Sequence, residues 1–190
     1  MATTDHYSNQ QRVGIFIDVQ NLYHSAKNLY RGRVNYRELV RHLVGDRQLI
    51  RTLGYVVRSE GIIDTLPLKA NRPDVPEGAH LSSEAAFFEA LEKAGIELRL
   101  KDIQVYAGGS KKADWDVGMA VDAIRMASFL DVIILVTGDG DFIPLVDYLK
   151  WGMGRLVEVA AFRRSASSKL QEAADRFINV EEIPKIIIRK

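Results

Sequence analysis

Cysteine is absent from this sequence of 190 residues. Its absence excludes disulfide bonds and thiolate metal ligands, so any metal must be held by oxygen ligands or by histidine. The four histidines are scattered without HxxxH or similar spacing: His6, His24, His42 and His80. We therefore expect a metal site, if one exists, to be built from oxygen ligands.

Long hydrophobic runs and an excess of charge are absent as well. No run of about 18 or more apolar residues occurs, and residues 1–11 are polar, so neither a membrane span nor a secretory signal is predicted. We expect a soluble, cytoplasmic protein with no membrane partner. The net charge of +1 lacks the basic excess that usually accompanies nucleic-acid binding, so any such binding would depend on local patches.

The hydrophobic content of 47% is enough to build the core of one domain. Short apolar runs predict strands at residues 13–18, 53–57, 96–100, 132–136 and 156–162. Helical periodicity and capping signals predict helices that begin near residue 21 and at residue 35, and others over 82–94, 117–127, 145–149 and 168–177. Strand and helix alternate, which favours a three-layer α/β/α fold with a mostly parallel central sheet.

The expected boundaries of this domain are residues 12 and 180. Residues 1–11 are predicted to form a flexible N-terminus and residues 181–190 a C-terminal tail. The stretch 71–79 has three helix-breaking residues and no periodicity, which indicates a surface loop. The apolar residues 186–188 indicate an edge strand or a contact surface, which leaves a homo-oligomer open.

Aspartates stand at strand ends or near helix starts in three separate segments: Asp18, Asp114, Asp116, Asp139 and Asp141. In an open parallel sheet, the functional crevice lies beyond the carboxyl ends of the strands. We therefore expect the carboxylates of Asp18, Asp116 and Asp139 to lie close enough to share one cation.

Carboxylates that converge in one crevice raise each other's pKa unless a cation neutralises them, so this pattern indicates a bound metal. Oxygen ligands select Mg²⁺ or Mn²⁺, which commonly keep waters and accept a phosphate oxygen. Such a site suits phosphodiester hydrolysis, because the metal activates water and steadies the leaving oxygen. Asn21 can supply a neutral oxygen or position the phosphate.

Each aspartate also has a purely structural interpretation. Asp114 and Asp116 can be ordinary helix caps, and Asp139 and Asp141 can serve the glycine turn between them. Asp122, inside a predicted helix, fits a solvated face. Asp18 is predicted to end a buried strand, where a cap or turn role is unavailable, and it is the acid least explained by structure.

Three segments carry a resemblance to a known family: FIDVQNL at residues 16–22, KADWDVGMAVD at residues 112–122 and VTGDGDFIPL at residues 136–145. A softer match joins SSKL at residues 167–170 to ADRF at residues 174–177. In this order and spacing, the segments resemble the NYN domains of the PIN-like nucleases, in particular the LabA-like (DUF88) group. The matching pieces cover most of residues 12–180.

The resemblance implies a PIN-like fold and a divalent-metal site. Its acidic set falls on Asp18, Asp116, Asp139 and Asp141, with Asn21 beside them. Asp114, Asp122 and Ser167 lie within the matching segments as further candidates. The loop from residue 64 to residue 80 is longer than in the simplest members of the family.

Basic and aromatic residues in the predicted loops supply candidate contacts to RNA, or alternatively to DNA. We expect seven cations to lie in loops that border the acidic crevice, where they can hold phosphates on either side of the cut. They are Arg31, Arg33, Lys111, Lys112, Arg163, Arg164 and Lys169. Tyr23, Tyr30 or Trp115 can stack a base of a single strand. The alternative is that all of these are solvated charges and core aromatics.

Three functions are compatible with this pattern. The first is a Mg²⁺- or Mn²⁺-dependent nuclease, most directly a ribonuclease. The second is a regulatory or RNA-binding module that keeps the acidic pocket without turnover. The third is a phosphatase of the haloacid dehalogenase type, which the pair Asp139 and Asp141 suggests but Gln20 disfavours, because that chemistry needs an acid two residues after the first aspartate.

Overall fold

The computed structural model describes residues 9–58, 83–102, 104–105, 111–112 and 115–189. Some of the predicted features lie outside the described residues. They are the surface loop at residues 71–79, the longer loop from residue 64 to residue 80 that contains it, and Asp114. Most of the predicted flexible N-terminus lies outside them as well. Within the described part, no helix is both long enough and apolar enough to cross a bilayer.

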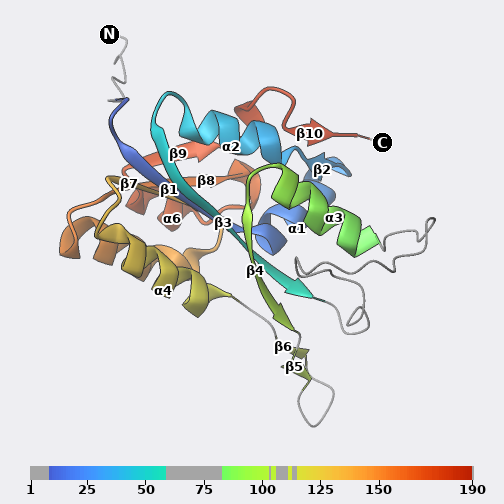
Figure 1. Ribbon diagram of the computed structural model, residues 1–190, viewed down its shortest axis with the longest axis horizontal. Helices are drawn as coiled ribbons and strands as arrows, with labels where there is room; N and C mark the ends of the chain where they lie inside the picture. The colour runs from blue at the N-terminus through green and yellow to red at the C-terminus, as the bar shows by residue number, and fades with distance from the viewer. Residues whose placement is uncertain (1–8, 59–82, 103, 106–110, 113–114, 190) are drawn as a thin grey trace, which may run out of the picture.

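A six-stranded sheet forms the centre of the molecule, with the strand order β4-β3-β1-β7-β8-β9 (Figure 1). Every neighbouring pair in it is parallel. The strands are β1 (Arg12–Asp18), β3 (Gln48–Arg58), β4 (Glu97–Asp102), β7 (Val132–Val136), β8 (Leu156–Ala161) and β9 (Arg176–Asn179). This confirms the predicted α/β fold with a mostly parallel sheet.

Two smaller pairings and several helices surround the sheet. The antiparallel pairs join β2 (Arg33–Val34) to β10 (Ile187–Ile188) and β5 (Gln104–Val105) to β6 (Lys111–Lys112). The α-helices are α1 (Val19–Tyr30), α2 (Tyr36–Val44), α3 (Ser83–Lys93), α4 (Asp116–Ala127), α5 (Ile143–Asp147) and α6 (Ser168–Ala173). Short 3-10 helices are η1 (Gly140–Phe142), η3 (Arg163–Ser165) and η4 (Val180–Glu182), and η2 (Tyr148–Gly152) is π-helical.

The sheet has a hydrophobic core on each face because alternate residues of a strand point to opposite sides. On β1, Ile15 and Ile17 join the core formed with α1, α2 and α3. Phe16 joins the other core, formed with α4, α5 and α6. Both faces are therefore covered by helices, which explains why β1 and β7 are apolar at nearly every position.

Two predicted boundaries were wrong. The helix predicted over residues 168–177 ends at Ala173, and the chain then forms β9, the sixth strand. The backbone N–H of Val157 donates to the Asp175 carboxylate (2.8 Å), and this bond turns the chain into the sheet. The first helix begins at Val19 rather than near Asn21, because β1 leads into α1 without a loop.

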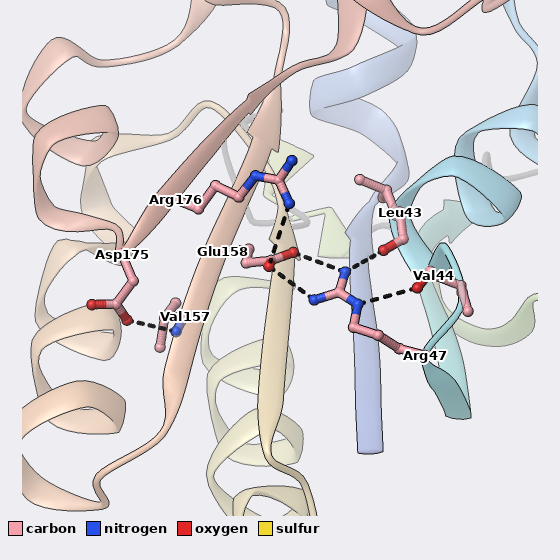
Figure 2. Close-up of polar contacts among 7 residues, drawn as sticks. All are labelled: Leu43, Val44, Arg47, Val157, Glu158, Asp175 and Arg176. Carbon is pink, nitrogen blue, oxygen red and sulfur yellow. Dashed lines mark hydrogen bonds and ion pairs between the residues drawn. The ribbon is translucent and has the colours of Figure 1, made fainter. Parts of the chain in front are cut away.

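A buried ion pair joins the turn before β3 to the middle of β8 (Figure 2). Two guanidinium nitrogens of Arg47 contact the two carboxylate oxygens of Glu158 at 2.9 and 3.1 Å. Arg47 also donates to the backbone carbonyls of Leu43 and Val44, and Arg176 approaches Glu158 at 3.9 Å. Since both charges of the pair are almost fully buried and saturated with partners, the cluster is a structural clamp between α2 and the sheet.

Candidate metal and nucleic-acid site

Asp18 occupies the junction between β1 and α1. Its carboxylate accepts a hydrogen bond from the backbone N–H of Asn21 (3.0 Å) and caps α1. The interpretation that a cap role is unavailable to Asp18 was therefore wrong, because the last residue of the strand is also the N-cap. Burial raises the pKa of Asp18, and the nearby charge of Asp139 raises it further against the lowering effect of the cap hydrogen bond.

Asp139 follows β7, the strand beside β1. Ile17 and Val136 are in register, so the residues after them emerge together at the carboxyl edge of the sheet. Thr137 connects the two acids: its hydroxyl donates to the Asp18 carboxylate (3.4 Å) and accepts from the backbone N–H of Asp139 (3.2 Å). A buried threonine thus ties the Asp18 carboxylate to the backbone of Asp139. The charge of Asp139 contributes to the raised pKa of Asp18, so the two carboxylates lie near each other.

Asn21 fixes the turn that carries Asp139. Its side-chain oxygen accepts from the backbone N–H of Gly138 (3.0 Å), which ties α1 to the chain leaving β7. The Asp139 carboxylate in turn accepts from the backbone N–H of Asp141 (3.0 Å) and caps η1. Asn21 therefore lies beside the acidic pair, and Asp141 lies one turn further out with an exposed side chain.

Asp116 and Asp122 lie on α4, which covers the other face of the sheet from α1. Asp116 is the first residue of this helix and is partly buried, while the N-cap position belongs to Trp115. Asp122 accepts hydrogen bonds from the Tyr55 hydroxyl (3.1 Å) and from Arg99 (3.3 Å). The interpretation of Asp122 as a solvated-face residue was wrong, because it is the partner of a buried tyrosine.

The acids do not form a ready-made group of three. Across the described residues, no three acidic or histidine side chains lie close enough to hold a metal ion, so Asp18, Asp116 and Asp139 do not converge as expected. The structure brings two of these acids together, Asp18 and Asp139. Mg²⁺ usually binds through one or two carboxylates and completes its shell with water and phosphate, so this pair fits a divalent cation. The raised pKa of Asp18 indicates a carboxylate whose charge a cation would stabilise.

Ser167 and the basic residues near it lie on the segments that follow β8. The Ser167 hydroxyl caps α6, and its backbone N–H donates to the carbonyl of Gly138 (2.9 Å) next to Asp139. Arg163 and Arg164 belong to η3, which contacts the middle of α1 through a hydrogen bond between Ser165 and Ser25 (2.9 Å). Arg163, Arg164 and Lys169 are exposed.

Other predicted contacts lie elsewhere. Lys111 and Lys112 form β6, and the structure does not describe their side chains. Arg31 is the C-cap of α1 and Arg33 lies in β2. At 1.5 Å per residue, α1 separates Asp18 from Arg31 by roughly 20 Å, so the expectation that Arg31 and Arg33 border the acids was wrong.

The three candidate stacking residues differ in exposure. Tyr23 is 37% exposed. The ring of Tyr30 packs on Phe162, and burial and a hydrogen bond with Glu181 raise its pKa to about 12. The indole N–H of Trp115 donates to the carbonyl of Val56 (3.0 Å). Tyr23 alone presents a surface to solvent without such an anchoring bond.

Sequence reasoning missed two residues of the site. Thr137 stands next to the acids in the chain, but its contact with Asp18 spans 119 positions and has no local signal. Tyr36 is buried, and its hydroxyl has no hydrogen-bond partner among the residues that the structure describes. Burial raises its pKa, and the charge of Asp18 adds to the effect, so this hydroxyl lies near the acidic pair. Its position after the helix cap Asn35 gave no sign of this.

Comparison with known proteins agrees with this geometry. The model of the NYN domain matches residues 12–181, and the chain belongs to this family. NYN domains are part of the PIN-like nuclease superfamily, as predicted. The chain is also similar to the crystal structure of a protein of unknown function, VPA0982 from Vibrio parahaemolyticus RIMD 2210633, with a TM-score of 0.77 and 27% identity over 96% of this chain and 99% of that one. No curated protein matches the sequence.

Proposed function

We propose that the protein is a Mg²⁺- or Mn²⁺-dependent nuclease that hydrolyses phosphodiester bonds in RNA, and that it belongs to the LabA-like group. The observation that supports this most strongly is the pair Asp18 and Asp139, joined by Thr137 at the carboxyl edge of two adjacent parallel strands. In a parallel α/β fold this edge is where ligands bind. The membership of a nuclease superfamily supports the reaction class.

Asp18 and Asp139 are the residues that would hold the cation. When bound, the cation would supply an activated water and a positive charge beside the phosphoryl oxygens. Thr137 fixes the Asp18 carboxylate relative to the backbone of Asp139, and Asn21 holds the backbone turn that carries Asp139. Burial around Asp18 and Tyr36 limits bulk water, which strengthens the interaction of the charges in the site.

Asp116 and Asp141 have secondary roles in this proposal. Both lie at the start of helices that approach the same edge of the sheet, and each carboxylate would accept a hydrogen bond from water in the site. Arg163, Arg164 and Lys169 lie on η3 and α6 beside the turn after β7, where they can neutralise phosphates on one side of the scissile bond.

A second function is an RNA-binding module without turnover. The observation in its favour is that the described residues contain no three-carboxylate group. Incubation of the purified protein with labelled RNA and DNA, in Mg²⁺, Mn²⁺ or chelator, distinguishes the two functions. Metal-dependent RNA cleavage supports the nuclease, and RNA binding without cleavage in either metal supports the module.

A further inference from the structure

A hollow of ≈ 500 Å³ opens at the C-terminal end of α1, away from the acidic pair. Its lining comes from α1, the turn after it, β2 and β10. We call it the α1 groove and define it by six residues: Tyr23, Lys27, Asn28, Arg31, Arg33 and Ile188. Half of these are cations and none is acidic, so the groove suits an anion.

The three cations have no carboxylate partner among the described residues, where the ion pairs involve other side chains. No acid follows Asp18 within α1. Lys27 and Arg31 also stabilise the C-terminal end of the helix through its dipole. Arg33 lies beyond the helix and does not interact with its dipole in this way. Since one cation would suffice for the dipole, helix stability does not explain why three cations line the groove.

The backbone that shapes the groove is held in place. Arg31 takes a left-handed conformation (φ 50°), and its backbone N–H donates to the carbonyl of Lys27 (3.0 Å). Arg33 pairs with Ile188 in the β2–β10 ribbon, so the two side chains lie on one face of it. The backbone positions that carry the cations are therefore set before any ligand arrives.

Tyr23 gives the groove an aromatic wall. Its ring centre lies 6.0 Å from that of Phe87, and the Lys27 ammonium lies 5.7 Å from the ring. Phe87 packs near the ring, and Tyr23 as a residue is 37% exposed. Cations beside an exposed aromatic ring are the combination that binds single-stranded nucleic acid, through phosphate contacts and base stacking.

We propose that the α1 groove is a second binding site for single-stranded RNA, with the scissile bond of the same strand at Asp18 and Asp139. This inference rests on the proposed function. Helix α1 connects the two sites, with the acids at its first turn and the groove at its last, roughly 20 Å apart. A strand that spans both sites is fixed in its direction across the protein.

The test measures RNA affinity against salt concentration in the presence of chelator, with the full chain and a labelled strand of about 16 nucleotides. The triple variant Lys27→Ala, Arg31→Ala, Arg33→Ala should lower the salt slope by about 2, since each phosphate contact on a single strand contributes about 0.7. A charge-matched control, Arg51→Ala, Lys93→Ala, Arg125→Ala, should leave the slope unchanged. The single variant Lys27→Gln should lower the salt slope by about 0.7. It tests the same groove if the triple variant does not fold.

Tyr23→Ala separates RNA from other polyanions. It should weaken binding of the strand about fivefold or more through lost stacking, while affinity for inorganic polyphosphate stays the same. Equal losses for both ligands would show that the groove takes phosphate alone and would overturn the assignment to RNA.

The outcomes keep the two proposals apart. A salt slope that is the same in wild type and the triple variant overturns the groove as an RNA site, whatever the cleavage assay shows. A groove-dependent slope in a protein that cleaves nothing in Mg²⁺ or Mn²⁺ supports the groove and overturns the nuclease. A wild type without RNA affinity overturns both.

Discussion

At the residue scale, Asp18 combines two roles that one substitution can separate. Asp18→Asn keeps an effective N-cap for α1 but removes the charge. The pKa of Asp18 is raised in the folded protein, so at pH values above this pKa the ionised carboxylate lowers the free energy of unfolding. At pH values below the pKa of Asp18 in the unfolded chain, the residue is protonated in both states and this cost is absent. The variant should therefore be at least as stable as wild type at pH 7, with the difference narrowing toward about pH 4. Urea unfolding across this pH range measures it.

Asp18→Ala is the matched control for the cap. It removes both charge and acceptor, so it should be less stable than Asp18→Asn by about 1 kcal/mol at every pH. Equal stability of the two variants would contradict the capping role. A difference between wild type and Asp18→Asn that does not change with pH would contradict the raised pKa.

Thr137 links the two acids, and its hydroxyl can be removed without loss of shape. Thr137→Val leaves the partly buried backbone N–H of Asp139 without its acceptor, which should cost about 1 kcal/mol. Thr137→Ser keeps the hydroxyl and should bind Mn²⁺ like wild type, while Thr137→Val binds it more weakly. Calorimetric titration with Mn²⁺ checks this, and equal affinities would show that Thr137 does not orient the carboxylates.

At the scale of secondary-structure elements, the clamp between Arg47 and Glu158 holds the turn before β3 against β8 (Figure 2). Removal of one partner leaves a buried charge, so Glu158→Leu should cost about 3–5 kcal/mol. The double variant Arg47→Met, Glu158→Leu should recover much of that loss. The exposed pair of Arg51 and Glu97 is the control, because Arg51→Ala should cost about 0–1 kcal/mol.

Urea unfolding of the four proteins measures the clamp. A double variant as unstable as Glu158→Leu alone would show that the hydrogen bonds from Arg47 to Leu43 and Val44 matter more than the pairing with Glu158. The acidic pair lies at the other edge of the sheet, so RNA cleavage per folded molecule should change little in any of them.

Some elements are more predictable from sequence than others, for physical reasons. Strands β1 and β7 are covered on both faces, so nearly every position is apolar and the pattern is distinctive. Strand β9 is short and lies at the sheet edge, and its neighbours Ala173 and Ala174 suit a helix equally well. Only the pairing of β9 with β8, a contact between distant segments, decides its structure.

At the scale of the whole molecule, the parallel sheet decides which acids meet. The rule that strand ends share one edge places Asp18 and Asp139 at the same edge from the sequence, and the pairing of β1 with β7 brings them together. The same rule does not place Asp116, because this residue lies on a helix that covers the other face of the sheet. Nor does it place Arg31, which lies at the far end of the 12-residue helix α1 from Asp18. Those positions depend on helix length and packing, which local patterns do not contain.

The central claim is that the pair Asp18 and Asp139 serves metal-dependent RNA hydrolysis. The direct measurement is the single-turnover cleavage rate of labelled RNA in Mg²⁺, Mn²⁺ or chelator, for wild type, Asp18→Asn, Asp139→Asn and the double variant. Wild type should cleave only with metal, and each single variant should lose roughly a hundredfold or more in rate. The double variant should fall little further, because the two residues act as one unit. Wild-type rates in either single variant, still dependent on Mg²⁺ or Mn²⁺, would contradict the account.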